Sequence, residues 1–372
     1  MKIIINASTL SGTGVTQVAV SFINECKKFV GNKYIVFLSP QTAKNIDKTT
    51  FSSNFTFYEF GKNWLYSIKG KKDIKAMKDI ENKEKPDVVF SVFGPSLWRP
   101  KAPHLMGYAY PHYIYPDSPL FKMLSFKQKI ELWIKKTVHM SQLKSNGDYY
   151  VCETDDVAER LGSIHNIAKE NIFTAYNTAS SVFLNYKPKN HIESEVFKFY
   201  SLCSPYLHKN LSILNKVIPL LVSRKLPKKI VFYTTFRQSD YEVMFTNEVK
   251  PFIINVGPLN IVDCPAFVDS CDALFLPTLL ECYSASYPEA MALKKPIITS
   301  NLPFATTVCK DAAIYFDPLD EYSIVDKIVS LVTDVDLYNQ LIVSGINRLK
   351  FFGGPEVRAK KYLEICKLIS SK

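Results

Sequence analysis

The sequence lacks the patterns that would place the chain in a membrane or in an oxidising compartment. Along its 372 residues, no apolar run approaches the roughly 20 residues that a membrane span needs. The eight cysteines are scattered, with no CxxC pair and no spacing typical of a metal site. This distribution favours reduced, structural thiols over disulfides. Residues 1–6 are too short for the apolar part of a signal peptide and predict a first strand instead. We therefore expect a cytoplasmic globular protein.

Acidic residues are the scarcer charged class, with 35 Asp and Glu against 46 Lys and Arg, for a net charge of +11. This excess favours an anionic partner, which could be a nucleic acid, an acidic membrane face or a diphosphate ligand. Lysine is spread along the chain, and no DNA- or RNA-binding motif occurs in it. We therefore do not expect nucleic acid as a partner.

Short apolar runs, typical of strands buried on both faces, alternate with segments of helical spacing. Such runs occur at 3–5, 34–38, 87–92, 197–203, 229–234 and 272–277. This alternation predicts an α/β fold with parallel sheets. The length allows two domains of about 150 residues. Residues 178–195 are polar and aperiodic, so we expect the linker there.

Glycine is scarce in the sequence, and two glycines lie close together near the N-terminus. Gly12 and Gly14 lie in the loop after the first predicted strand, where a ligand approaches a doubly wound sheet. They are not a dinucleotide fingerprint, because Gln17 stands where the third glycine would be. A loop that needs a positive φ and a loop that approaches a ligand both fit this pattern.

The stretch 272–302 predicts a strand, a loop, a helix and a further strand. The backbone N–H groups of Tyr283, Ser284 and Ala285 would be unpaired in the first turn of the helix and could bind phosphate. Glu289, inside the helix, could accept hydrogen bonds from the two hydroxyls of a ribose. Spacing alone also allows Glu281 to be a solvated loop acid and Glu289 a surface helix residue.

A longer sequence pattern begins within this stretch and continues to residue 318. It reads ECYSASYPEAMA at 281–292, PIITSNLPF at 296–304 and DAAIYFDP at 311–318. These motifs resemble, in order, the C-terminal signature of retaining glycosyltransferases of the GT-B fold, and more narrowly glycosyltransferase family 4, or group 1. The resemblance implies two Rossmann-like domains with parallel sheets that face a cleft. It places the acceptor-binding domain at 1–180, the nucleotide-sugar-binding domain at 195–354, and a helix that returns to the first domain at 355–372.

The resemblance also implies roles for residues of the second domain. Lys209, within SPYLHKN at 204–210, resembles the lysine that binds the donor diphosphate. The Gly-Arg pair that usually precedes it is replaced by Cys203 and Ser204. By the same resemblance Glu281 would orient hydroxyls of the donor sugar, Glu289 would hold the ribose, and Gly257 would line the nucleobase pocket. Tyr283, Ser284 and Ala285 would contact the diphosphate through their amides.

In the first domain, the resemblance implies that Gly14, and less directly Gly12, let the backbone approach the donor phosphates. A histidine after a strand of this domain reaches the sugar or the acceptor in the family. His112, in an aromatic loop, is nearest in kind, and a structural histidine is the alternative.

Residues 119–144 combine helical spacing with aromatic, aliphatic and lysine side chains. A basic amphipathic segment of this kind suits an anionic membrane surface. A helix packed on the sheet with a solvated lysine face fits the pattern as well.

The resemblance implies transfer of a sugar from a nucleotide-diphosphate donor to a glycan or lipid-linked glycan, with retention at the anomeric carbon and without a metal or other cofactor. Synthesis of a surface polysaccharide such as O-antigen, lipopolysaccharide or capsule is the expected setting, in the cytoplasm or on the inner face of its membrane. A nucleotide-sugar epimerase and a non-catalytic sugar-binding or scaffold protein of the same fold are the alternatives.

Overall fold

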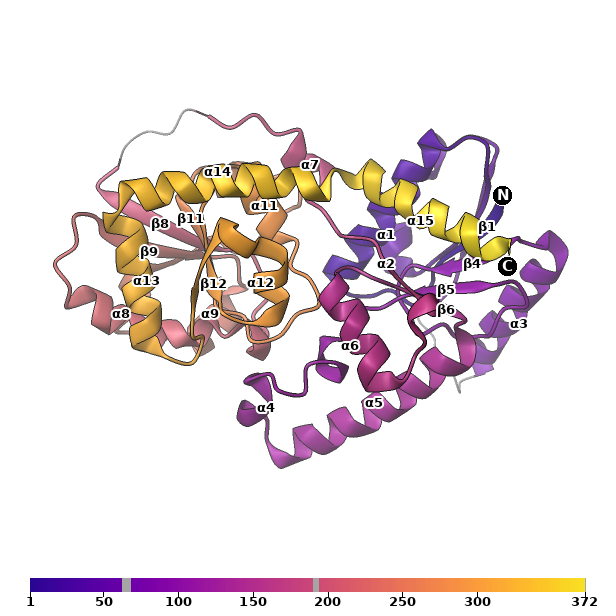
Figure 1. The fold of residues 1–372 in the computed structure, drawn as a ribbon, viewed down its shortest axis with the longest axis horizontal. Coiled ribbons are helices and arrows are strands. Elements are labelled where there is room, and N and C mark those ends of the chain that lie inside the picture. The colour runs from indigo at the N-terminus through magenta and orange to yellow at the C-terminus, as the bar shows by residue number, and fades with distance from the viewer. Residues whose placement is uncertain (62–67, 190–193, 372) are drawn as a thin grey trace. The chain divides into compact units, whose positions relative to one another are not determined.

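The structure, a computed structural model, describes residues 1–61, 68–189 and 194–371 (Figure 1). Two compact units make up the chain. The first comprises Met1–Ile114, Ser125–Tyr176 and Pro355–Lys372, and the second comprises Tyr115–Leu124 and Asn177–Gly354. Each unit contains one parallel sheet with helices, as the alternating sequence pattern predicts.

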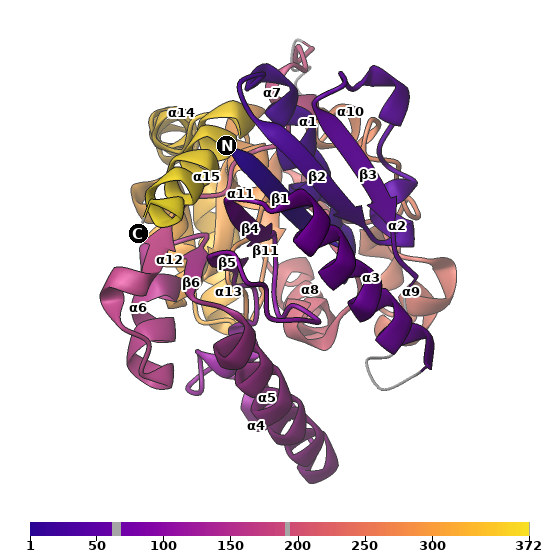
Figure 2. The same cartoon turned by 90° about the vertical axis from the view of Figure 1, so that its right-hand side faces the viewer.

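The sheet of the first unit has seven parallel strands in the order β3-β2-β1-β4-β5-β6-β7 (Figure 2). Its strands are β1 (Lys2–Ala7), β2 (Lys33–Leu38), β3 (Phe55–Glu59), β4 (Val88–Ser91), β5 (His104–Gly107), β6 (Tyr149–Cys152) and β7 (Ile172–Thr174). The helices of this unit are α1 (Thr13–Glu25), α2 (Pro40–Ala43), α3 (Ile68–Glu84), α5 (Phe126–Asn146), α6 (Asp155–His165) and α15 (Pro355–Ser370).

The sheet of the second unit has six parallel strands in the order β10-β9-β8-β11-β12-β13. Its strands are β8 (Val196–Ser201), β9 (Lys229–Thr234), β10 (Ile253–Asn255), β11 (Ala273–Leu276), β12 (Ile297–Ser300) and β13 (Ala313–Phe316). The helices are α4 (Leu120–Met123), α7 (Ser181–Leu184), α8 (Leu214–Val222), α9 (Gln238–Met244), α10 (Cys264–Asp269), α11 (Ser286–Ala292), α12 (Pro303–Cys309), α13 (Glu321–Thr333) and α14 (Val335–Phe352).

The continuous apolar run in β1 reflects burial on both faces of the sheet. Ile3 and Ile5 belong to one hydrophobic cluster, and Ile4, between them, belongs to another. Alternate side chains of a strand point to opposite faces, so helices on both sides require an apolar residue at every position.

The C-terminal helix α15 packs on the first unit. The ring of Tyr362 lies 5.3 Å from that of Phe22 on α1 and 5.0 Å from that of Phe90 on β4. The Arg358 guanidinium donates a hydrogen bond of 2.8 Å to the Ser21 hydroxyl. The prediction that the last helix returns to the first domain is therefore confirmed.

The strand order reverses between β1 and β4 in the first sheet, and between β8 and β11 in the second. Ligands of open α/β sheets bind at such reversal points, outside the carboxyl ends of the strands. In the second unit this edge receives the loops 202–210 and 277–285, which carry Lys209 and Glu281.

The segment predicted as one helix over 119–144 is divided at Ser125. The Ser125 hydroxyl accepts a hydrogen bond from the backbone N–H of Gln128, and the Gln128 side chain accepts one from the backbone N–H of Ser125. This reciprocal capping box starts α5 at Phe126. No helix among the described residues is long and apolar enough to cross a membrane.

Gly107, the last residue of β5, is required by the close approach of another segment. A Cβ placed on it would lie 1.9 Å from the carbonyl oxygen of Val92. We expect Gly107→Ala to destabilise the protein by about 2 kcal/mol, because the backbone must move to relieve the overlap. Urea unfolding would measure this loss.

Gly31→Ala is the matched control, since a Cβ there has no heavy atom within 4 Å. The control should change stability by about 0.5 kcal/mol or less. Equal stability of the two variants would contradict the close packing at Gly107.

Candidate functional site

The candidate site in the second unit forms around the turn between β11 and α11. All four residues of β11 are buried. The helix begins at Ser286, two residues later than the sequence pattern predicts, with Ala285 as its N-cap. The described part of the chain supplies no acceptor for the backbone N–H groups of Ser284 and Ala285. These two donors are therefore available to an anion at the carboxyl edge of the sheet.

Lys209 forms an ion pair and hydrogen bond with Glu281. The lysine ends a short 3-10 helix after β8, and the glutamate lies in the loop after β11. Both side chains are largely buried, with 14% and 11% of their surfaces exposed. They meet because β8 and β11 are neighbours in a parallel sheet, so that their carboxyl ends lie at one edge.

Hydrogen bonds hold the two loops together. The carbonyl oxygen of His208 accepts a bond of 3.0 Å from the Thr278 hydroxyl and one of 2.7 Å from the backbone N–H of Leu279. The Asn210 side chain donates to the carbonyl oxygen of Pro318 at 2.8 Å, and its backbone adopts φ 55°. Lys209 is thus fixed between two anchored residues.

The charge state of the pair follows from burial and mutual attraction. Burial lowers the pKa of Lys209, but the facing carboxylate of Glu281 outweighs it, and the net result is a raised pKa. Burial also raises the pKa of the adjacent Cys203 thiol to about 11, so this thiol is neutral at physiological pH. Cys203, which stands where the resemblance places a Gly-Arg pair, therefore supplies no charge beside the Lys209 cation.

Glu289 lies on α11 and is partly buried. Burial raises the pKa of its carboxyl to about 8, while Ser180 beside it acts in the opposite direction. A carboxyl with this pKa is mostly protonated at neutral pH. It ionises only when a ligand favours the carboxylate or when the pH rises.

Tyr200, near the end of β8, was not singled out by the sequence because it stands in an ordinary apolar strand pattern. Its ring is 2% exposed, and its hydroxyl has no hydrogen-bond partner among the described residues. Glu289 is close enough to add to the raised pKa of Tyr200, for which burial is the main cause. The buried Tyr200 hydroxyl thus makes no hydrogen bond with the Glu289 carboxyl.

The other residues predicted for the second unit have distinct settings. Gly257 follows β10 and adopts φ 77°, and a Cβ on it would meet no heavy atom within 4 Å. The positive φ explains the glycine, and the open space is compatible with a ligand. Tyr283 is 9% exposed, and its hydroxyl donates to the carbonyl oxygen of Asn177 at 2.9 Å. Its side chain is therefore held by the protein, and the predicted role of its backbone N–H stays a prediction.

Three predicted residues belong to the first unit. Gly12 is the N-cap of α1, and Gly14 lies in the first turn, with no heavy atom within 4 Å of an added Cβ. His112 lies in a 3-10 helix (Pro111–Tyr113) after β5, and burial lowers the pKa of its imidazole, so it is neutral at pH 7. Their roles toward a donor or an acceptor remain predictions.

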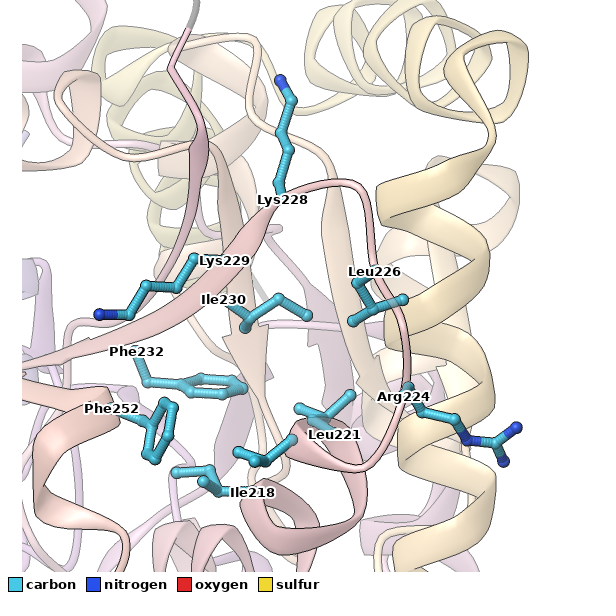
Figure 3. Close-up of a pocket in the computed structure, with 10 residues that line it drawn as sticks. Ile218, Leu221, Arg224, Leu226, Lys228, Lys229, Ile230, Phe232 and Phe252 are labelled. Atoms are coloured by element: carbon cyan, nitrogen blue, oxygen red, sulfur yellow. The ribbon is translucent and has the colours of Figure 1, made fainter.

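No group of three or more His, Cys, Asp or Glu that could hold a metal ion occurs in the part of the chain that the structure describes. A hollow in the second unit lies at the amino end of β9, under α8 (Figure 3). Its volume is about 350 Å³, and aliphatic and phenylalanine side chains line it, including Ile218, Leu221 and Phe232. Because it lies at the strand end opposite to Lys209, it is separate from the candidate site.

The sequence of the second unit matches the family model described as Glycosyl transferases group 1 over residues 199–334. Those residues form a group 1 glycosyltransferase domain. The matched range includes Lys209, Glu281 and Glu289. The predicted resemblance to group 1 glycosyltransferases is thus confirmed over these residues. No curated protein sequence matches the chain.

Solved structures resemble the chain over its whole length. A glycosyltransferase from Rickettsia africae aligns with a TM-score of 0.73 at 17% identity, covering 99% of this chain and 98% of that one. The sucrose-phosphate synthase of Thermosynechococcus elongatus aligns with a TM-score of 0.73 at 12% identity, covering 100% and 99%. Anabaena HepE, in complex with UDP and glucose, aligns with a TM-score of 0.68 at 12% identity, covering 99% of each chain. These likenesses confirm the predicted GT-B fold.

Proposed function

We propose that this glycosyltransferase moves a sugar from a nucleotide-diphosphate donor to a hydroxyl of a glycan or lipid-linked glycan, with retention at the anomeric carbon. The observation that supports this most directly is the Lys209–Glu281 pair at the carboxyl edge of β8 and β11, next to the unpaired N–H groups of Ser284 and Ala285. A cation and two amide donors at one edge suit a diphosphate, which gains negative charge as it leaves the sugar.

The proposed reaction breaks the bond between the anomeric carbon and the diphosphate oxygen, and the electron pair leaves with the diphosphate. The acceptor oxygen then bonds to the anomeric carbon on the same face, and its proton goes to a diphosphate oxygen. Lys209 and the two amides stabilise the leaving group, Glu281 orients sugar hydroxyls, and Glu289 holds the ribose. Gly257 lines the space for the nucleobase, and Gly12, Gly14 and His112 serve the donor phosphates and the acceptor from the first unit.

Two structural relatives support a more specific proposal for the donor and for the pathway. Anabaena HepE is described in complex with UDP and glucose, which makes UDP-sugars the first donors to test. A lipopolysaccharide outer core galactosyltransferase, WaaB, aligns with a TM-score of 0.63 at 13% identity over 99% of this chain and 100% of that one. We propose a role in surface polysaccharide synthesis, such as O-antigen, lipopolysaccharide or capsule, at the cytoplasmic side of the membrane.

The test is a panel of UDP-, GDP-, dTDP- and ADP-sugars with the purified full chain. We expect saturable binding of one nucleotide class and slow release of the free sugar, because water can replace the acceptor in a transferase site. NMR of the released sugar should show the donor's anomeric configuration before mutarotation. Binding without any turnover, with or without acceptor glycans, would favour a sugar-binding protein. A change of the sugar while it stays attached to the nucleotide would favour an epimerase. Failure to bind any donor would overturn the proposal.

A further inference from the structure

The first half of α5 has almost no packing against the rest of the protein. Of residues 126–138, all except Leu132 and Lys136 are exposed. Figure 2 shows α5 extending away from the sheet of the first unit. The second half is anchored, because Met140 and Leu143 are buried. A helix in water normally gains most of its stability from packing an apolar face, so the exposed half lacks the usual covering.

The exposed half carries large apolar side chains on one face. Phe126 is 79% exposed, Trp133 67%, Ile134 50%, Ile130 44% and Val138 44%. Their spacing of three, four and seven to eight residues places them within one stripe along the helix. Single exposed apolar residues are ordinary on a protein surface, but a contiguous stripe marks a binding surface. We call these five residues the α5 stripe.

Lysines surround the α5 stripe. Within α5 there are five lysines, Lys127, Lys129, Lys135, Lys136 and Lys144, against one acid, Glu131, which gives a net charge of +4. Lys129 and Lys135 lie on opposite edges of the stripe by helical geometry, and Lys127 lies beside Phe126 at its start. A second copy of this helix on the stripe would bring these lysines together and cost Coulomb energy, whereas anionic headgroups would neutralise them.

The anchored half of α5 meets the loop that follows β5. The Tyr113 hydroxyl lies 2.9 Å from Nδ1 of His139, and the rings of Tyr110 and His139 lie 5.2 Å apart. His112, predicted to face the acceptor, lies between these two tyrosines in the sequence. A surface that holds α5 therefore also positions this loop of the first unit.

We propose that the α5 stripe inserts into the interface of an anionic lipid bilayer, with the surrounding lysines on the headgroups. The aromatic and aliphatic side chains would lie at the boundary between headgroups and acyl chains, parallel to the membrane plane. The purpose that we assign to this contact is to present a lipid-linked acceptor to the 108–113 loop, and that purpose rests on the proposed function. The lipid contact itself requires neither donor nor transfer.

The test is co-flotation of the full chain with vesicles, without any nucleotide sugar. We expect the wild type to float with phosphatidylcholine vesicles that contain about 30% phosphatidylglycerol and to stay behind with phosphatidylcholine alone. Salt at about 0.5 M should release a large part of the bound protein, because it screens the lysines. F126Q/W133Q should reduce the partition coefficient at least tenfold, and K127E/K129E should reduce it by a similar factor.

Val243→Gln is the matched control, since Val243 is 89% exposed on α9 of the second unit. It should float like the wild type. Circular dichroism should be the same for all variants, because the changed side chains are exposed. No flotation of the wild type, or unchanged flotation of F126Q/W133Q, would overturn the proposal. A concentration-dependent dimer that F126Q/W133Q dissociates, without vesicle binding, would also overturn it and assign the stripe to a second copy. Because donor binding is measured separately, either result leaves the proposed reaction to its own test.

Discussion

We expect Lys209→Met to lower kcat/KM by about 10²–10³, the loss that follows when one fixed donor to a developing negative charge is removed. Lys209 is the cation beside the turn that precedes α11, and Cys203 next to it is neutral. The loss should fall mainly on kcat, because negative charge on the diphosphate grows in the transition state. Steady-state kinetics with the donor found by the panel would measure it.

Lys209→Met also tests how much the Lys209–Glu281 pair contributes to the stability of the protein. Removing the lysine leaves the Glu281 carboxylate largely buried without its partner, which should destabilise the protein. K209M/E281Q should recover much of that stability without recovering activity. Lys250→Met is the matched control, since Lys250 pairs with the exposed Glu242 elsewhere in the same unit. Wild-type kcat/KM in Lys209→Met would contradict the diphosphate role of Lys209.

From the proposed ribose contact we expect Glu289→Ala to weaken donor binding by about 10²-fold, because the ribose would lose an acceptor that can ionise to bind both hydroxyls. The effect should appear in the Kd of the free nucleoside diphosphate as well as in that of the nucleotide sugar. It should be much smaller for a 2′,3′-dideoxy analogue, which has no hydroxyls to lose. Isothermal titration calorimetry would measure all three constants.

Glu242→Ala, which removes an exposed carboxylate of the same unit, is the control and should bind the donor like the wild type. If Glu289→Ala weakens the dideoxy analogue and the natural nucleotide equally, Glu289 does not contact the ribose and the assignment is wrong.

The raised pKa of Glu289 adds a pH signature to this prediction. The folded protein holds the carboxyl proton up to about pH 8, whereas the unfolded chain releases it near the ordinary value of 4.5. Between these values the folded state binds more protons, so the contribution of this group to stability falls as the pH rises. The Glu289→Gln variant has no carboxyl at this position, so its stability does not fall with pH for this reason. We therefore expect its melting temperature to exceed that of the unliganded wild type more at about pH 9 than at about pH 5. An equal difference at both values would contradict the raised pKa.

Local sequence patterns carried the secondary structure and the family. The isoleucine run of β1 is apolar at every position, which indicates a strand covered on both faces, and the structure has one. Glu281 and Glu289 lie within one short motif, so the sequence placed both acids at the same strand-loop-helix turn. Helix α15 begins at the predicted Pro355 and ends near the predicted residue, because helical spacing is a local signal.

The tertiary structure decided what local patterns do not encode. Lys209 and Glu281 are 72 residues apart, and they meet because the strand order makes β8 and β11 neighbours. The buried hydroxyl of Tyr200, which has no hydrogen-bond partner among the described residues, was also found only in the structure. A tyrosine in an apolar strand pattern has no sequence signal that distinguishes it.

The exposure of the α5 stripe is the clearest case. Helical periodicity predicts an apolar face but not what covers it, so the sequence left a packed helix and a membrane-facing helix both open. Only the folded chain shows that residues 126–138 lie outside the core. The sequence by itself thus determined the elements, the family and the acidic motif. Strand order and burial, which arise from contacts between distant segments, decided which residues share a site and which surfaces remain uncovered.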